Sequence, residues 1–158
     1  MPKLDYARIW IATAIVLLAT GANARTGAGA RRTVAAVRVT APPVIDGVVD
    51  DACWQGASST DSLIQFEPRN GEPSPHRTVI YVGFDDGALY VAFVCYDSDP
   101  SRIAAALTKR DSDLGDDDAV AIFLDSLNDG YTATAFVTNP LGTQWDFRIT
   151  DNGRTSDS

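Results

Sequence analysis

The amino-acid sequence predicts an all-β fold, an antiparallel β-sandwich of the jelly-roll type. Three observations support this prediction. Short runs rich in β-branched and aromatic residues recur along the chain, and turn signals built from Gly, Pro, Asn and Asp separate them. Two consecutive runs are apolar on both faces, which is typical of strands that are central or covered by another layer. The short spacing between turn signals favours strands joined in hairpins.

The first two strands are expected before residue 70. Residues 33–40 are rich in β-formers and predict a strand at a sheet edge. Residues 62–66 predict a short second strand, which Pro68 and the Asn70-Gly71 turn would close.

The clearest hairpin signal follows. Residues 78–85 and 88–96 are the two runs that are apolar on both faces, and they flank Asp86-Gly87. This pair favours a type I′ turn. After this hairpin, residues 102–107 are compatible with a short helix or with a bent strand.

A second hairpin and another strand complete the series. Residues 119–125 and 131–138 flank Asn128-Asp129-Gly130, and residues 143–149 predict a further strand. Because side chains alternate along a strand, Trp145 and Phe147 are expected on one of its faces. The other face would carry Gln144, Asp146 and Arg148.

The predicted organisation has one domain behind a secretory leader. The apolar run Ile9–Ala19 follows a basic start and is too short to span a bilayer, and Ala22-Asn23-Ala24 is typical of a signal-peptidase site. We therefore expect an exported protein that is periplasmic, secreted or at the cell surface, with no membrane span in the mature chain. The expected segments are a signal peptide at 1–24, a disordered lead-in at 25–32, the sandwich at 33–150, and at 151–158 a polar tail or truncation point with no further strand.

Composition excludes one class of partner. The chain has 13 Lys and Arg residues against 21 Asp and Glu residues, and a net charge of −8. Such a balance disfavours nucleic acid, whose phosphates attract basic surfaces.

The opening of the predicted domain is the most distinctive motif. Residues 42–54 combine a stiff Pro-Pro entry, the Asp46-Gly47 turn, and Asp50, which is placed to cap a short helical turn that carries Trp54 inward. The order P-x-I-D-G-x-x-D-x-x-x-W resembles the start of the family 9 carbohydrate-binding modules and of related domains in exported bacterial proteins. The resemblance implies a binding module and not a catalytic one.

Three later blocks extend the resemblance over essentially all of the mature chain. The L-Y-V-A strand begins at Leu89, the segment from Arg110 to Asp125 is similar to the family's R-D…D-D-x-x-x-x-F-x-D pattern, and residues 139–146 resemble its return strand. At Ala121 the family usually has Glu. The resemblance implies a β-sandwich completed by further strands, structural calcium, and attachment in longer relatives to a hydrolase or an outer-membrane barrel as a C-terminal domain.

Candidate sugar contacts follow from side-chain chemistry. Flat aromatic rings stack on the C–H faces of pyranoses, and bidentate donors and acceptors bind hydroxyl groups. Trp54 is expected in the core, Trp145 is balanced between binding and core packing, and Tyr96 is a weaker candidate. Arg110 and Asp118 could instead pair with each other, and the other polar residues could cap turns. The predicted carbohydrate-binding residues are Trp145, Arg110, Asp118, Gln144, Asn139 and Tyr131, with Asp111, Asp125 and Asp146 as further polar candidates.

The acidic run 111–118 is the candidate calcium site. Calcium takes six to eight hard oxygen ligands, and the resemblance implies that ion here. The spacing does not match an EF-hand loop, and the alternative is a solvated acidic loop. The predicted ligands are Asp111, Asp116 and Asp117.

Residues for other chemistry are sparse. Cys53 and Cys95 could form one disulfide in an oxidising compartment or remain two buried thiols. The single histidine, His76, lies in a Pro-rich turn with no nucleophile elbow nearby, and zinc has no ligand set. A glycosidase would need paired carboxylates across a cleft, but the only glutamates, Glu67 and Glu72, share a turn.

These observations predict a non-catalytic, exported domain that recognises a plant or microbial polysaccharide or its ends and is linked to carbohydrate catabolism. The alternative is a surface β-sandwich that binds a protein partner or is purely structural, as the N-terminal piece of a longer outer-membrane-associated protein.

Overall fold

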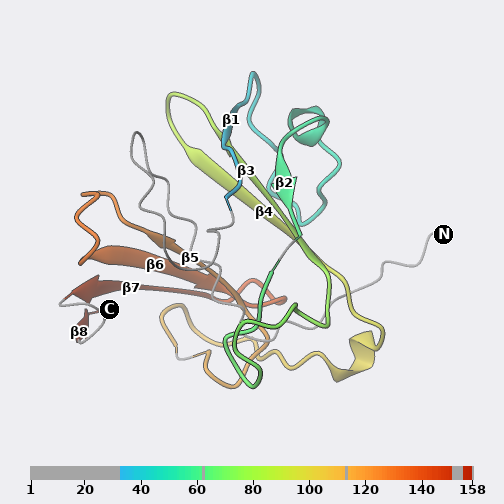
Figure 1. The fold of residues 1–158 in the computed structure, drawn as a ribbon, viewed down its shortest axis with the longest axis vertical. Coiled ribbons are helices and arrows are strands. Elements are labelled where there is room, and N and C mark those ends of the chain that lie inside the picture. Colours follow the sequence, from blue (N-terminus) through green and yellow to red (C-terminus); the bar gives the residue numbers. More distant parts are fainter. Residues whose placement is uncertain (1–32, 62, 113, 151–154, 158) are drawn as a thin grey trace. The chain divides into compact units, whose positions relative to one another are not determined.

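The computed structural model describes residues 33–61, 63–112, 114–150 and 155–157. For residues 155–157 it describes the backbone only. The predicted signal peptide and lead-in lie outside these residues. The described chain contains no α-helix and carries eight strands in two four-stranded sheets (Figure 1), which confirms the all-β class and agrees with the two sheets that a sandwich requires. It divides into two compact units, the first at residues 33–101 and the second from Arg102 onward, with one sheet in each. The single domain stays a prediction.

In the sheet of the first unit, the strand β3 has a neighbour on both sides. The strand β4 pairs antiparallel along its whole length, from Thr78 opposite Cys95 to Phe84 opposite Leu89. On the other edge, β1 runs parallel to β3 and β2 runs antiparallel. The predicted hairpin of residues 78–96 is therefore confirmed. The bounds are β1 Val37–Arg38, β2 Ser59–Thr60, β3 Thr78–Phe84 and β4 Leu89–Cys95.

The two strands predicted before residue 70 are corrected. The strand expected at 33–40 is only the two residues of β1, because its hydrogen bonding ends with Val39 N–H donating to the Phe84 carbonyl at 2.9 Å and the Pro-Pro pair that follows has no N–H to offer. The strand expected at 62–66 is absent from the described residues of that segment. They fold back on 71–74 instead, through a bridge between Ile64 and Pro73 and a 2.8 Å bond from Gln65 N–H to the Glu72 carbonyl.

The core of the first unit forms around β3. Ile80 and Val82 are fully buried, and the 3₁₀ turn η1 (Ala52–Trp54) brings the Trp54 ring against Tyr81 with ring centroids 5.9 Å apart. This confirms that Trp54 is a core residue. The cap predicted at Asp50 is wrong, because the turn begins after Asp51. The Asp51 side chain does not cap the turn and accepts a bond from Val44 N–H instead.

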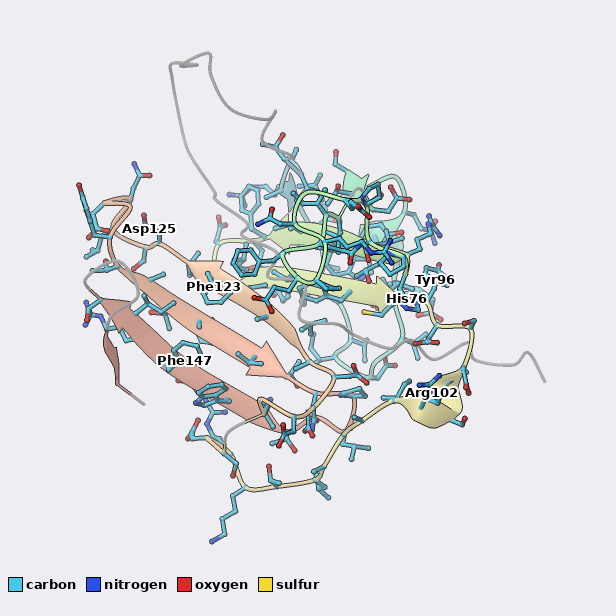
Figure 2. The ribbon with its side chains drawn as sticks, turned by 60° about the horizontal axis from the view of Figure 1, so that its bottom comes forward. His76, Tyr96, Arg102, Phe123, Asp125 and Phe147 are labelled. Atoms are coloured by element: carbon cyan, nitrogen blue, oxygen red, sulfur yellow. The ribbon has the colours of Figure 1, made fainter. Side chains whose placement is uncertain are left out.

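In the second unit the strand order is β5-β6-β7-β8, all antiparallel. The runs predicted at 119–125, 131–138 and 143–149 correspond to β5, β6 and β7, so these three predictions are confirmed. Phe123 of β5 and Phe147 of β7 (Figure 2) are both opposite Ala135 of β6, and these three side chains share one face of the sheet. The bounds are β5 Val120–Leu124, β6 Ala133–Thr138, β7 Gln144–Thr150 and β8 Thr155–Asp157.

The expectation that no strand follows residue 150 is wrong. The strand β8 pairs with the end of β7, with Thr155 opposite Thr150 and Asp157 opposite Arg148. The polar composition of this segment did not indicate a strand. An edge strand needs backbone hydrogen bonds on one side only, so it can form without apolar side chains. Residues 102–107, for which a helix or a bent strand was expected, have no regular structure beyond the 3₁₀ turn η2 (Pro100–Arg102).

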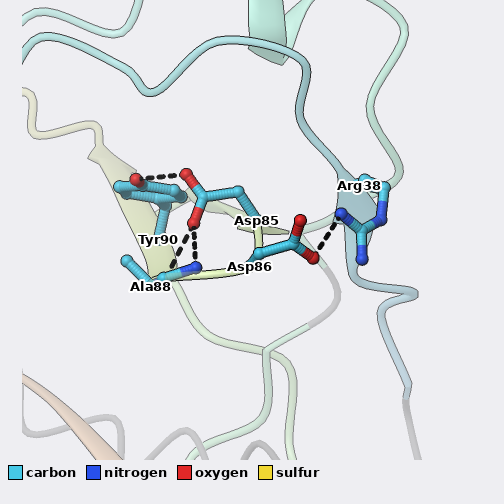
Figure 3. A network of polar contacts seen from close by, with 6 residues as sticks. Arg38, Asp85, Asp86, Ala88 and Tyr90 are labelled. Atoms are coloured by element: carbon cyan, nitrogen blue, oxygen red, sulfur yellow. Dashed lines mark hydrogen bonds and ion pairs between the residues drawn. The ribbon is translucent and has the colours of Figure 1, made fainter.

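At the tips of both hairpins, aspartate carboxylates accept hydrogen bonds from backbone N–H groups. At the first tip neither Asp86 nor Gly87 has a positive φ, so the predicted type I′ turn is wrong. The Asp85 carboxylate instead accepts bonds from Gly87 N–H at 2.7 Å and Ala88 N–H at 2.8 Å, and the Tyr90 hydroxyl donates to its other oxygen at 2.8 Å (Figure 3).

The second hairpin tip uses two carboxylates in the same manner. Asp125 accepts bonds from Asp129 N–H and Gly130 N–H, and Asp129 accepts bonds from Tyr131 N–H and Thr132 N–H. Asp125, predicted as a further polar contact for a sugar, therefore holds a turn. The tip is fixed by its own side chains.

Candidate ligand-binding site

The sheet of the second unit has two chemically different faces. Strand pairing places residues that are opposite each other on the same face. Over β5, β6 and β7, one face, here called the apolar face, carries only apolar residues, and the other, here called the mixed face, carries both apolar and polar ones. The apolar face includes Ala121, Phe123, Val137, Trp145 and Phe147, and the mixed face includes Ile122, Thr134, Phe136, Gln144, Asp146 and Arg148.

Trp145 lies on the apolar face. Its ring packs on Phe147 with centroids 4.5 Å apart, and its cross-strand neighbour is Val137. Ala121, which stands where the resembled family usually has Glu, is the next residue of the same row. The Trp145 side chain is half-buried. No cross-strand neighbour in this row offers a hydrogen bond to a sugar hydroxyl, so the surroundings of Trp145 are those of a packing residue.

Arg110 binds two polar residues of the mixed face, Gln144 and Asp146. Its Nη1 donates to Gln144 Oε1 at 2.5 Å, its Nη2 donates to Asp146 Oδ1, and its Nε faces Asp111 Oδ2 at 3.6 Å. The guanidinium is held at three nitrogens, yet 57 % of the side chain is exposed. These four residues are called the Arg110 cluster below. The cluster brings together two predicted binding residues, Arg110 and Gln144, and two of the further polar candidates, Asp111 and Asp146.

The Arg110 cluster contributes little to stability and keeps donors that are not used within it. Its ion pairs are exposed, and exposed pairs contribute little to folding. A guanidinium carries five N–H donors, and two of them are used by Gln144 and Asp146, which leaves one donor on each terminal nitrogen. Gln144 also keeps its amide N–H₂, since its oxygen is the atom that accepts from Arg110.

Phe136 is the residue that the sequence predictions missed. It is opposite Asp146 on β7 and Ile122 on β5, so its ring lies on the mixed face between a carboxylate and an aliphatic side chain. It is 44 % exposed. The signal was present in the alternation Thr134-x-Phe136-x-Thr138, which places one aromatic residue in an otherwise polar row.

Asn139 and Asp118, two other predicted sugar contacts, hold the chain together. Asn139 is 5 % exposed, and its amide donates to the Ala106 carbonyl and to Asp117 while its oxygen accepts from Leu141 N–H and Thr143 N–H. The Asp118 carboxylate accepts a hydrogen bond from Ala104 N–H at 2.8 Å, and Asp118 N–H donates one to the Ala104 carbonyl at 2.7 Å. The alternative pairing of Arg110 with Asp118 does not occur, because Arg110 pairs with Asp111 and Asp146.

Tyr131 lies away from the cluster in sequence and in the sheet. It follows the tip of the hairpin between β5 and β6 and is 63 % exposed. The nearby Leu127 is 65 % exposed. The tip therefore presents two large apolar side chains on a turn that Asp125 and Asp129 hold in place.

Two of the three predicted calcium ligands, Asp117 and Asp111, face protein donors. Asp117 accepts bonds from Asn139 Nδ2 at 2.7 Å and Ala106 N–H at 3.2 Å, and Asp111 pairs with Arg110. Asp116 is exposed. In the part of the chain that the structure describes, no three His, Cys, Asp or Glu side chains are grouped so that they could hold a metal ion. Calcium stays a prediction.

Cys53 and Cys95 are both free thiols, which answers the open question of their pairing. Burial raises the pKa of the Cys95 thiol, and a hydrogen bond with Thr78 opposes that rise. The pKa of Cys53 is also raised, by removal of water and by the negative charge of Asp51. Neither group has the lowered pKa that marks a reactive cysteine.

Within the ranges described above, no helix has the length and apolar character needed to cross a membrane. Comparison of the chain with protein-family models, with curated proteins and with solved structures finds no match.

Proposed function

We propose that this chain is a non-catalytic, exported carbohydrate-binding protein whose binding surface is the mixed face of the second unit. The single observation that carries the proposal is the Arg110 cluster beside the exposed ring of Phe136, which is the cross-strand neighbour of Asp146. An exposed aromatic ring offers a stacking face for a pyranose, and the planar polar groups beside it offer hydrogen bonds to its hydroxyl groups. The ligand class is a plant or microbial polysaccharide or the end of one.

Each group would have a separate task. The Phe136 ring would stack on the C–H face of a sugar, since its neighbour Ile122 extends the apolar surface on one side. The free donors of Arg110 and Gln144 would bind hydroxyl oxygens, and Asp146 would accept hydroxyl protons. Trp145 has no part in this arrangement, because it lies on the opposite face of β7.

The proposal is tested by calorimetric titration of the chain with xylan fragments, cello-oligosaccharides and simple sugars, with and without calcium. Saturable binding that is lost in Phe136→Ala and in Phe136→Leu would support the mixed face, because leucine keeps apolar bulk and removes the ring. Phe66→Ala is the matched control, since Phe66 is an exposed phenylalanine of the first unit. Binding lost in Trp145→Ala and kept in Phe136→Ala would place the surface on the apolar face and overturn the proposal.

A second candidate function is recognition of a protein partner by the tip of the hairpin between β5 and β6. Leu127 and Tyr131 are exposed there on a preorganised turn, and such turns lose little entropy on binding. A folded chain that binds none of the sugars would favour this candidate, and a Leu127→Ser, Tyr131→Ser double variant would then be compared with wild type for capture of a partner by cross-linking on intact cells.

A further inference from the structure

Asp111 has an unusual backbone conformation next to the Arg110 cluster. Its φ is +64°, in the left-handed region that residues with a Cβ seldom adopt. Asn128 is the only other non-glycine residue of the described ranges with a positive φ, and it lies in a hairpin turn. Asp111 is not in a hairpin but at the third position of the turn that Ser112 N–H closes by donating to the Lys109 carbonyl at 3.2 Å. Such conformations persist where the surroundings hold them in place.

Three contacts hold Asp111 against β7. Its N–H donates to the Gln144 carbonyl at 2.9 Å, its Oδ1 accepts from Asp146 N–H at 3.5 Å, and its Oδ2 faces Arg110 Nε at 3.6 Å. The first two contacts fix the backbone and the carboxylate of Asp111 relative to the strand. The third contact restrains Nε of the guanidinium, in addition to the bonds that Gln144 and Asp146 make with its terminal nitrogens.

We infer that Asp111 is the positioning residue for Arg110. The inference rests on the proposed function and adds to it the group that orients the donors. Asp111 holds Nε from one side while Gln144 and Asp146 hold the terminal nitrogens, so the two remaining N–H groups point in a set direction before a ligand arrives. Preorganisation of this kind strengthens binding, because the rotamer entropy of a long side chain has already been lost.

This role differs from the calcium ligation predicted for the same residue. The Asp111 carboxylate already faces a cation, and a divalent ion placed on it would be repelled by the guanidinium. A positioning role also uses the left-handed conformation, since that conformation allows the N–H and the carboxylate of one residue to contact Gln144, Asp146 and Arg110 together.

Two variants remove the charge of Asp111 and remain compatible with its left-handed backbone conformation. Asp111→Gly tolerates the positive φ and removes the whole side chain, and Asp111→Asn tolerates it and keeps a neutral oxygen for Asp146 N–H. Asp50→Asn is the control, because Asp50 is an exposed aspartate of the first unit. The first measurement is the ¹⁵N relaxation of the Arg110 Nε–H group by NMR, assigned by its loss in Arg110→Lys. The second is calorimetric titration with the cello-oligosaccharide that the wild-type chain binds best.

We expect an ordered Arg110 Nε–H in wild type and in Asp50→Asn, and a mobile one in Asp111→Gly and Asp111→Asn. We also expect both Asp111 variants to weaken oligosaccharide binding by about tenfold, because the Arg110 donors would no longer be oriented before the ligand binds. An Arg110 Nε–H that is equally ordered in Asp111→Gly and wild type would overturn the positioning role even if sugars bind. Absence of sugar binding by the wild-type chain would overturn the proposed function, and the NMR result would still decide whether Asp111 orders Arg110.

Discussion

The amide of Asn139 donates a 2.7 Å hydrogen bond to the carboxylate of Asp117, twenty-two residues earlier in the chain. The same amide reaches the Ala106 carbonyl, so one buried side chain joins the irregular segment before β5 to the turn between β6 and β7. All polar atoms of this side chain are thereby bonded, as burial requires. The polar residues of the acidic run are therefore divided between structural roles and the Arg110 cluster.

We predict that Asn139→Ala lowers the free energy of unfolding by about 2–3 kcal/mol, because it leaves the N–H of the buried Thr143 without its partner and removes three further part-buried hydrogen bonds. Asn139→Asp should be worse, since it places a second carboxylate beside Asp117. Chemical denaturation measures both effects. The control is Asn70→Ala, an exposed position for which a change within about 0.5 kcal/mol is expected. Equal stability of Asn139→Ala and Asn70→Ala would contradict the assigned role.

The second prediction concerns the close packing at Gly83. A Cβ at this position would lie 2.9 Å from Val39 Cγ1 and 3.3 Å from Trp54 Cζ3. Gly83→Ala should therefore destabilise the chain by about 1–3 kcal/mol through overpacking. The nearest atom belongs to Val39, so adding Val39→Ala should recover part of that loss in a double-mutant cycle. Gly87→Ala is the control, because its Cβ would meet only Asp85 Oδ1 at 3.5 Å.

The third prediction concerns pH. The Tyr90 hydroxyl, followed by the backbone N–H of Gly87, lowers the pKa of Asp85 below its ordinary value. A carboxyl whose folded pKa is below its unfolded pKa stabilises the fold above the unfolded value of about 3.9, and that stabilisation is lost as the pH falls through the folded value. Asp85→Asn should thus lower the melting temperature at neutral pH, and its curve should approach that of wild type in acid.

Thermal unfolding measured by circular dichroism between neutral and acidic pH tests this sign. Asp129 gives an independent repeat, because the N–H groups of Tyr131 and Thr132 lower its pKa as well. Asp50→Asn should follow wild type throughout. A difference between wild type and Asp85→Asn that grows as the pH falls would show that the carboxylate has the opposite effect.

The fourth prediction is that the folded chain has two reduced, slowly reacting thiols. Burial raises the pKa of Cys95, and removal of water together with Asp51 raises that of Cys53, so little thiolate is present at neutral pH. Thiol titration with a chromogenic disulfide should give slow modification of the native chain and two equivalents in denaturant without reductant. No free thiol in denaturant would mean that Cys53 and Cys95 are oxidised.

Local patterns were sufficient for the hairpin strands. The runs that became β3, β4, β5, β6 and β7 are bounded by turn residues and rich in β-formers, and strand formation there agrees with burial. The failures share one cause. The described residues 63–66 have β-forming side chains but fold back on 71–74, and β8 has a polar sequence but pairs with the open edge of β7. In both cases the available partner decided the structure, and intrinsic propensity did not.

Turn and cap chemistry was predicted less well. The pair Asp86-Gly87 favours a type I′ turn, yet Asp85 supplies its carboxylate to two backbone N–H groups and makes a positive φ unnecessary. Asp50 was expected to cap the turn at Trp54, and Asp51 occupies the boundary instead. Neighbouring aspartates offer equivalent local bonds, so the path of the surrounding chain selects among them.

The sequence by itself determined which side chains share a face of β7. Alternation places Trp145 with Phe147, and Gln144 with Asp146 and Arg148, because successive side chains on a strand point to opposite sides. Only the tertiary structure decided that Arg110, thirty-four residues before Gln144, lies on the face of Gln144 and not on that of Trp145. That choice depends on the path of the irregular segment and on the left-handed backbone at Asp111. No local periodicity encodes either one, because both are held in place by hydrogen bonds to residues distant in the chain.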